Sequence, residues 1–456
     1  MNEFPERKSK PQRMPQGGGA EIVVEQEDAP DRPAPPQAST RLWVIVLIAF
    51  LARLALMTIG HTYKFSPRDD HFGFGWETGR IARAIALGQG FSNPFHGITG
   101  PTAWIAPLYP YFLATVFKIF GVYSNASAWV ALAVNSVFSA LTCYTIYHIG
   151  REVFGTRSRV PAWAAWIWAL LPSQMFWAIR FAWETSLSAY LLSVVVLLML
   201  RHERDARLPH WIGFGALWAT IALSSPALLS LLPFFGIWWL VRQPNRAVVV
   251  RHAAISALLF IAINVPWTLR NYETFGKPIF IRGNFGAEFR MGNGPGAEGY
   301  WMFWQHPTQD PTEFAKYQRM GEAEYVTQRK QQAMKWIREN PKKFAQITLK
   351  RALLFWAGIP RSEVIAGFDI RDLSEGAFFF SSSLSFVGLF LMLRCRQRGS
   401  FIFAISLFVY PMVYYLTFAH ERYRHPIEPL MILLAVYPVA EALRNRTGLK
   451  ASKTTA

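Results

Sequence analysis

The segment 69–111 combines acidic, aromatic and glycine residues in a way that could support chemistry, beginning DDHFGFGWE. It holds Asp69, Asp70 and Glu77, and a helix-like pattern over 78–87 follows. A carboxylate just before a helix is stabilised by the helix dipole, so Glu77 could simply cap that helix. The functional interpretation is that Glu77, with Asp70 as the alternative, is a general base that deprotonates an attacking hydroxyl or ammonium group.

A second acidic residue lies in the segment FWAIRFAWETSLSAYLL, which contains Arg180 and Glu184 between two apolar runs. Charges at a membrane boundary are costly, and they tend to be paired or functional. The two residues could form a mutual ion pair or anchor the chain at the interface. In the functional interpretation, Glu184 is a supporting acid that orients the acceptor or the base, and Arg180 binds a phosphate.

The composition indicates the elements that must position these residues. Of 456 residues, 52% are hydrophobic, and apolar runs of membrane-spanning length recur along the chain. We therefore predict an all-α polytopic membrane protein. The net charge of +18 fits positive cytoplasmic loops and contact with anionic membrane lipids. No basic stripe with interleaved aromatic residues supports a nucleic-acid partner.

The short basic loops predict how the chain crosses the membrane. If they share the cytoplasmic side, the run 104–121 must be re-entrant or lie at the surface rather than cross. That choice leaves ten spans with both termini inside, and we prefer it to a crossing at 104–121. The loops are 151–159, 201–207, 242–252 and 394–398. The predicted spans are 42–60, 126–149, 161–178, 185–200, 211–223, 227–241, 253–269, 378–393, 401–418 and 427–443.

The predicted organisation has five parts. A disordered cytoplasmic tail covers 1–40, and a transmembrane module covers 41–269 with its first outer loop at 61–125. An outer-face region over 270–377 contains a predicted helix at 312–340 and an amphipathic segment at 344–358. C-terminal spans at 378–443 and a cytoplasmic tail at 444–456 complete the chain.

Arginines are frequent on the predicted outer side, where the positive-inside bias should deplete them. Their abundance calls for an anionic partner, and guanidinium groups bind phosphate in a bidentate manner. Contact with lipid headgroups is the simpler explanation for any single residue. For the group we favour a phosphate site, and its candidate residues, besides Arg180, are Arg270, Arg282, Arg422 and Arg424.

Motifs for nucleotides and metals are missing from the sequence. There is no P-loop, and the GNGPG segment has neither a lysine nor a strand–helix context. An activated sugar donor must then come from the membrane, as a polyprenyl-phosphate sugar. Asp70 with His71 could contribute to a metal site, but no second ligand cluster has matching spacing. No cofactor is predicted, and the sequence leaves a divalent metal open.

Three segments together resemble the GT-C superfamily of integral-membrane glycosyltransferases. They are WETGRIARAIALGQGF with the following APLYPYFLA, the FWAIRFAWETSLSAYLL turn, and HERYRHPIEPLMILLAVY. More narrowly, they are similar to bacterial relatives of protein O-mannosyltransferases and lipid A aminoarabinose transferases, a family 39-like group. The resemblance implies a GT-C-like helix bundle with a helical first outer loop and a long, partly helical outer region.

The resemblance also implies roles for particular residues. In that family an acid of the first outer loop acts as the base, and outer arginines or lysines hold the donor phosphate. This assigns the base to Glu77 and a supporting acid to Glu184. The family commonly has an Asp-Glu pair before its helix, whereas here Glu77 follows Trp76. The base therefore stays open between Glu77 and Asp70.

The sequence thus predicts a polyprenyl-phosphate-dependent glycosyltransferase of a bacterial cytoplasmic membrane, with its active site on the extracytoplasmic face. The acceptor could be a glycolipid, a polysaccharide or a protein, and the oligomeric state is open. A transporter or flippase of a lipid-linked anion is the alternative. We rank it below the transferase, because a transporter would require charged residues at mid-membrane and an internal repeat. A non-catalytic assembly or polymerase subunit is a third candidate.

Overall fold

The computed structural model describes residues 37–65, 72–359 and 370–454. Helices dominate this part of the chain, and apart from two isolated β-bridges it contains no strand pairing. Five helices include a stretch that is long and apolar enough to cross a membrane. They are α1 (Gln37–Ile59), α4 (Asn125–Phe154), α10 (Arg246–Phe275), α15 (Ile370–Arg394) and α18 (Glu428–Thr454). The protein is therefore an integral membrane protein with an all-α fold, as predicted.

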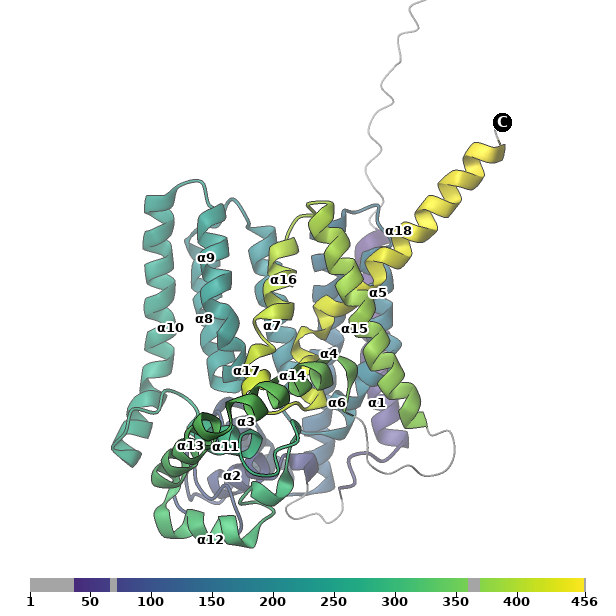
Figure 1. Cartoon of the computed structure of the whole chain (residues 1–456). Helices are drawn as coiled ribbons and strands as arrows, with labels where there is room; N and C mark the ends of the chain where they lie inside the picture. The colour runs from purple at the N-terminus through teal and green to yellow at the C-terminus, as the bar shows by residue number, and fades with distance from the viewer. Residues whose placement is uncertain (1–36, 66–71, 360–369, 455–456) are drawn as a thin grey trace, which may run out of the picture.

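Shorter apolar helices complete the bundle seen in the upper part of Figure 1. Proline breaks two of the runs that we predicted as single spans, because proline removes a backbone N–H and clashes with the preceding turn. Pro172 separates α5 from α6, and Pro411 separates α16 from α17. The run 227–241 follows Pro226, where a 3-10 segment begins and leads into α9. The shorter helices of the bundle are α5 (Val160–Leu170), α6 (Pro172–Arg180), α7 (Thr185–Arg201), α8 (Leu208–Ser224), η2 (Pro226–Leu231), α9 (Leu232–Arg242), α16 (Ser400–Phe408) and α17 (Met412–Leu416).

The core of the bundle lies around α4, which packs against α1, α5 and α7, while α18 packs against α5 and α15. Arg53 of α1 is fully buried there. Its guanidinium group donates hydrogen bonds to Ser139 and to the carbonyl oxygens of Ala49, Trp168 and Ala169. Because the last two carbonyls belong to the end of α5, Arg53 satisfies acceptors that the broken helix would otherwise leave without donors.

One end of the bundle carries a layer of helices, seen in the lower part of Figure 1. The predicted helix 312–340 is in fact two helices, because Gly321 between them adopts a positive φ of 72°. Pro341, which follows the predicted helix, is the first residue of the next one. The helices of this layer, called the outer layer below, are α2 (Glu77–Ala86), α3 (Leu108–Phe120), α11 (Phe285–Gly292), α12 (Pro311–Met320), α13 (Glu322–Glu339) and α14 (Pro341–Ala357).

Helix α3 explains the behaviour of the run 104–121. It has 13 residues, with Pro107 at its N-cap. At 1.5 Å per residue it is roughly 20 Å long, which is shorter than the ~30 Å hydrocarbon core of a bilayer. Helix α3 is therefore too short for a full crossing by itself, and its re-entrant or surface position stays a prediction.

The loops that we predicted to be cytoplasmic meet through ion pairs at the other end of the bundle. Arg398 contacts Glu203 at 2.7 Å and Glu152 at 2.9 Å. Arg201 and Arg242 also lie within 4.0 Å of one of these two carboxylates. The two ends of the bundle are thus chemically distinct, one carrying the outer layer and the other these basic loops.

Candidate active site

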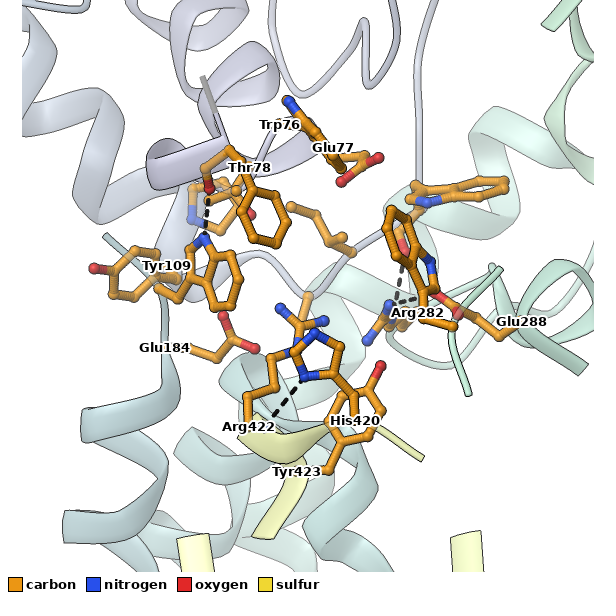
Figure 2. Close-up of a pocket in the computed structure, with 18 of the residues that line it drawn as sticks. Trp76, Glu77, Thr78, Tyr109, Glu184, Arg282, Glu288, His420, Arg422 and Tyr423 are labelled. Atoms are coloured by element: carbon orange, nitrogen blue, oxygen red, sulfur yellow. Dashed lines mark hydrogen bonds and ion pairs between the residues drawn. The ribbon is translucent and has the colours of Figure 1, made fainter. Parts of the chain in front are cut away.

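A cleft of about 100 Å³ lies where the outer layer meets the bundle. Its lining comes from segments far apart in the sequence: the start of α2, residues 104–110, the start of α7, residues 282–288 and 301–306, and residues 418–423. Figure 2 shows Glu77 on one side of this space and Glu184, His420 and Arg422 on the opposite side. Acidic and basic groups therefore face one another across the cleft.

Glu77 is the first residue of α2, and an unusual backbone turn places it there. Gly75 and Trp76 both have positive φ, and Trp76 at φ 34° and ψ −83° is strained for a residue with a side chain. The side chain of Glu77 is 16% exposed. Its Oε1 accepts a hydrogen bond of 2.5 Å from the Thr308 hydroxyl. The carboxylate is thus positioned at the cleft by contacts outside its own loop.

Two further residues surround this carboxylate. Arg80, one turn along α2, donates a 3.2 Å hydrogen bond to the Thr308 hydroxyl, so Thr308 links the guanidinium group to Glu77. His306 Nδ1 lies 3.7 Å from Glu77 Oε1, but it accepts the backbone N–H of Thr308. His306 therefore packs beside the carboxylate and is oriented by the backbone of Thr308.

Glu184 lines the cleft from the N-cap position of α7. The preceding turn is fixed by Asn135 of α4, whose amide donates to the carbonyl oxygens of Phe181 and Trp183. The Tyr109 hydroxyl donates in turn to the Asn135 side chain. Glu184 is therefore held by the ends of membrane helices rather than by a free loop.

Arg422 belongs to η4 (Glu421–Ile427) and lies near Glu184 in Figure 2. Its guanidinium carbon is 4.6 Å from the ring centroid of Trp183 and 5.1 Å from that of Tyr423. Such cation–π contacts hold a guanidinium group without using its hydrogen-bond donors. Arg422 also interacts electrostatically with Glu184 and Glu288. It is a positive charge held in place on the cleft wall.

Arg282 approaches from the other side. It donates through Nε to the Trp104 carbonyl at 3.1 Å, and its Nη2 lies 3.3 Å from Glu288. Glu288 also accepts a 2.7 Å hydrogen bond from Asn284, which fixes its orientation. Arg282 Nη1 makes no hydrogen bond to the residues that the structure describes, so it remains available to a bound anion.

His420 lines the same cleft and precedes η4. Burial, together with the neighbouring Arg422 charge, lowers the pKa of His420 to about 3. Its Nδ1 accepts the backbone N–H of Arg422. His420 is therefore neutral near pH 7 and acts there as a hydrogen-bonding group rather than as a cation.

The structure brings four of the predicted residues together, namely Glu77, Glu184, Arg282 and Arg422. Arg270, Arg424 and Arg180 do not line the cleft. Arg270 instead donates to the carbonyl oxygens of residues 91 and 102, and Arg180 is exposed at the end of α6.

Arg424 is buried, and its guanidinium group contacts Glu428 at 3.1 Å and stacks against Phe378. This arginine already has an anionic partner inside the protein, so a phosphate is not needed to explain it. Asp70, the alternative base, lies outside the described residues together with Asp69 and His71.

Sequence reasoning missed Thr308, His306 and Glu288 as members of this site. Thr308 and Glu77 are separated by 231 positions, and no spacing rule connects them. The aromatic and polar segment 301–308 was the available signal, because it follows the glycine-rich turn and contains Trp301, which also lines the cleft. No group of three or more metal-ligating side chains occurs within 37–65, 72–359 and 370–454.

No protein-family model and no curated protein matches the sequence. Among solved structures, the chain is similar to the Archaeoglobus fulgidus oligosaccharyltransferase in its apo form, with a TM-score of 0.53 and 15% identity. The match covers 90% of this chain and 52% of that one, so this chain spans about half the length of the oligosaccharyltransferase.

Two further structures have lower scores. The AglB oligosaccharyltransferase of the same organism, in complex with an inhibitory peptide and a dolichol-phosphate, matches with a TM-score of 0.49 and 14% identity, covering 91% of this chain and 52% of that one. ArnT from Cupriavidus metallidurans bound to undecaprenyl phosphate matches with a TM-score of 0.37 and 15% identity, covering 88% and 78%. At such identities a likeness concerns the fold alone, and the match to the apo oligosaccharyltransferase confirms the predicted GT-C-like membrane helix bundle.

Proposed function

We propose that this protein is a glycosyltransferase that transfers a sugar from a polyprenyl-phosphate donor to an acceptor, with Glu77 as the general base. One observation carries the proposal: carboxylates and arginines face one another across a single cleft at the end of an apolar helix bundle. A sugar phosphate needs this combination, a base on one side of the sugar and cations around the phosphate on the other. The GT-C-like fold supports the same conclusion.

Arg422 and Arg282 would hold the donor phosphate. Both line the cleft; Arg282 keeps Nη1 without a hydrogen bond to the described residues, and Arg422 lies over the Trp183 ring and interacts with Tyr423. The charge that develops on the leaving phosphate would be stabilised by these prearranged cations. Glu184, close to Arg422, would keep that arginine oriented when no donor is bound.

A second cavity of about 320 Å³ offers a route for the lipid chain of the donor. It shares Glu184, Arg282, Glu288 and Arg422 with the cleft and continues into the bundle. Its remaining walls come from the α8–η2 connection (224–230) and from residues 410–417 of the α16–α17 region. An apolar polyprenyl chain in this cavity would bring its phosphate to the two arginines.

The reaction would be a direct displacement. The acceptor oxygen or nitrogen attacks the anomeric carbon and forms the new glycosidic bond, while the bond from that carbon to the phosphate oxygen breaks. The electron pair leaves on the polyprenyl phosphate, and Glu77 takes the acceptor proton. Because base and leaving group lie on opposite sides of the sugar, the anomeric configuration is inverted, as in enzymes whose base activates the nucleophile on the face opposite the leaving group.

The outer layer would face away from the cytoplasm. The basic loops gather at the opposite end of the bundle, and such loops are retained on the cytoplasmic side. We therefore place the active site at the extracytoplasmic face.

The transport alternative would need a charge at mid-membrane that faces a pathway. Arg53 lies within a spanning helix, but its guanidinium group donates to Ser139 and to backbone carbonyl oxygens. It lines none of the cavities described above. Arg53 therefore fits a structural role, which favours the transferase.

The test is transfer of radiolabelled sugar from a polyprenyl-phosphate donor in membranes that contain the full chain. Glu77→Gln should lower product formation at least 100-fold, as expected for loss of a general base. Glu324→Gln is the matched control, because it neutralises an exposed carboxylate of the same outer layer. Asp70→Asn tests the alternative base.

Full transfer by Glu77→Gln would refute the assignment of the base. Movement of the labelled lipid without any glycosidic product in the wild type would refute the transferase and favour transport.

A further inference from the structure

A third cavity, separate from the two described above, lies at the end of the bundle opposite the candidate active site. It has a volume of about 950 Å³ and lies between the α7–α8 connection, the end of α9 and the α15–α16 connection. The proposed transfer reaction makes no use of it. Five arginines and two acidic residues line it: Arg201, Arg204, Arg242, Arg396, Arg398, Glu203 and Asp205.

Part of this charge is already compensated within the protein. Glu203 is buried at 6% exposure and lies 2.7 Å from Arg398 Nε and 3.6 Å from Arg242. Arg398 also contacts Glu152 at 2.9 Å, and Arg201 lies 3.7 Å from the same carboxylate. These ion pairs join the ends of α4, α7, α9 and the α15–α16 connection, so they fix the shape of the cavity.

Two arginines are not compensated. The side chains of Arg204 and Arg396 are exposed, and neither has an ion pair or hydrogen bond with the part of the chain that the structure describes. Arg396 has a positive φ of 50°, a conformation that residues with side chains rarely adopt. A cavity with fixed walls and two unpaired guanidinium groups is suited to an anion.

The cavity also has an apolar side. Trp238, Leu393 and Phe401 line it, and Phe401 is 56% exposed. Arg242 covers the Trp238 ring at 5.4 Å, which places a cation beside an aromatic surface. Tryptophan and arginine at the end of a spanning helix are typical of the headgroup level of a membrane. A ligand that fits has an anionic head and an apolar tail.

We propose that this cavity binds the headgroup of an anionic phospholipid, with its phosphate between Arg204 and Arg396 and its acyl chains along Leu393 and Phe401. Basic pockets between membrane helices are known sites for such headgroups. A free phosphate would share the guanidinium contacts but gain nothing from the apolar wall. The proposal does not depend on the transferase activity, because the site lies at the other end of the helices.

The experiment measures lipid binding to the full chain purified in detergent. Dioleoylphosphatidylglycerol is titrated against the wild type and against the double variant Arg204→Gln/Arg396→Gln, with dioleoylphosphatidylcholine as the neutral probe. The double variant should bind phosphatidylglycerol about 30-fold more weakly, from the usual contribution of two arginines near an anionic headgroup. Arg157→Gln/Arg159→Gln is the matched control, since both arginines are exposed at the same end of the bundle but outside the cavity.

Three results would overturn the proposal. Equal loss in the control variant would mean general attraction to a basic surface. Equal binding of phosphatidylcholine would mean that the charge is not recognised, and full displacement by millimolar inorganic phosphate would mean a soluble-anion site. Thermal unfolding without added lipid checks that the double variant folds, and if it does not, the single Arg204→Gln variant takes its place with an expected loss of about fivefold.

Discussion

Replacing Glu322 tests whether the outer layer is held to the candidate site by one buried carboxylate. Glu322, at the start of α13, is 6% exposed. It accepts hydrogen bonds from the Thr102 hydroxyl at 2.5 Å, from the Ala103 backbone N–H at 2.6 Å and from the Tyr317 hydroxyl at 3.0 Å. Residues 102 and 103 directly precede Trp104, whose carbonyl oxygen positions Arg282.

The expected magnitude follows from these three bonds. Hydrogen bonds to a charged group each contribute about 1.5 to 3 kcal/mol, but burying the carboxylate costs several kcal/mol in return. Glu322→Ala should therefore destabilise the contact of α13 with residues 102–104 by a net amount of about 3 kcal/mol. Local opening should then become about 100-fold more frequent. Glu322→Gln should cost much less, because the two hydroxyl partners can accept from an amide as well as donate.

Hydrogen exchange of the purified chain in detergent measures this opening at residues 102–104 and in α13. Glu324→Ala is the matched control, because Glu324 is exposed and only 3.4 Å from Lys277, a surface pair of at most about 1 kcal/mol. The reasoning fails if Glu322→Ala exchanges like this control, or if Glu322→Gln opens as readily as Glu322→Ala.

The remaining predictions concern charge and pH. Burial raises the pKa of Glu322, although its hydrogen bonds oppose the shift. The contribution of Glu322 to the stability of the outer layer should therefore be complete below pH 4.5 and be lost as the pH rises through the raised pKa, and this loss should disappear in Glu322→Gln when exchange is measured against pH. The pKa of His420 is lowered to about 3, so its contribution to stability should be complete above pH 6.5 and be lost as the pH falls towards 3. The free energy of unfolding should fall by up to about 1.4 kcal/mol per pH unit in this range. Thermal unfolding of His420→Gln should lack this dependence on pH. Arg424→Ala should lower the free energy of unfolding by about 3 to 5 kcal/mol, because it leaves Glu428 buried without its partner. The control Arg444→Ala removes an exposed ion pair and should have little effect on thermal unfolding.

The sequence predicted the fold well because apolar runs and helix breakers are local features. The run 126–149 became α4, and the helix expected at 78–87 became α2. The runs 161–178 and 401–418 are each broken at a proline, which the prediction overlooked because both runs are strongly hydrophobic overall.

The site was predicted less completely, because residue type does not determine where a side chain points. Glu77, Glu184, Arg282 and Arg422 meet in one cleft, as the distribution of polar residues suggested. The side chain of Arg270 was needed elsewhere, to satisfy the carbonyl oxygens of Phe91 and Thr102. Nothing in the local pattern of residues predicts that use.

Arg424 is different, because its partner is visible in the sequence. Glu428 follows four residues later, and this spacing puts the two side chains on one helical face. The spacing therefore marked Glu428 as a candidate partner for Arg424. Thr308 has no such signal, since it reaches Glu77 across 231 positions through the packing of the outer layer.

The two sides of the cleft depend on different parts of the protein, and this leads to a last prediction. Glu184 and Arg422 stand at the ends of bundle elements fixed by Asn135 and Trp183. Glu77, in contrast, depends on Thr308 of the outer layer for its hydrogen bond.

Loosening the outer layer should therefore reduce transfer before it reduces binding of the lipid phosphate. Thr308→Val, which removes the hydrogen bond to Glu77 and leaves the contact of Arg282 with Trp104 in place, should lower the rate of sugar transfer at least tenfold while the affinity for a polyprenyl phosphate without sugar changes less than threefold. A parallel loss of both would mean that the arginine side of the cleft also relies on the outer layer, through the contact of Arg282 with Trp104. Titrating the polyprenyl phosphate against the variant distinguishes the two arrangements.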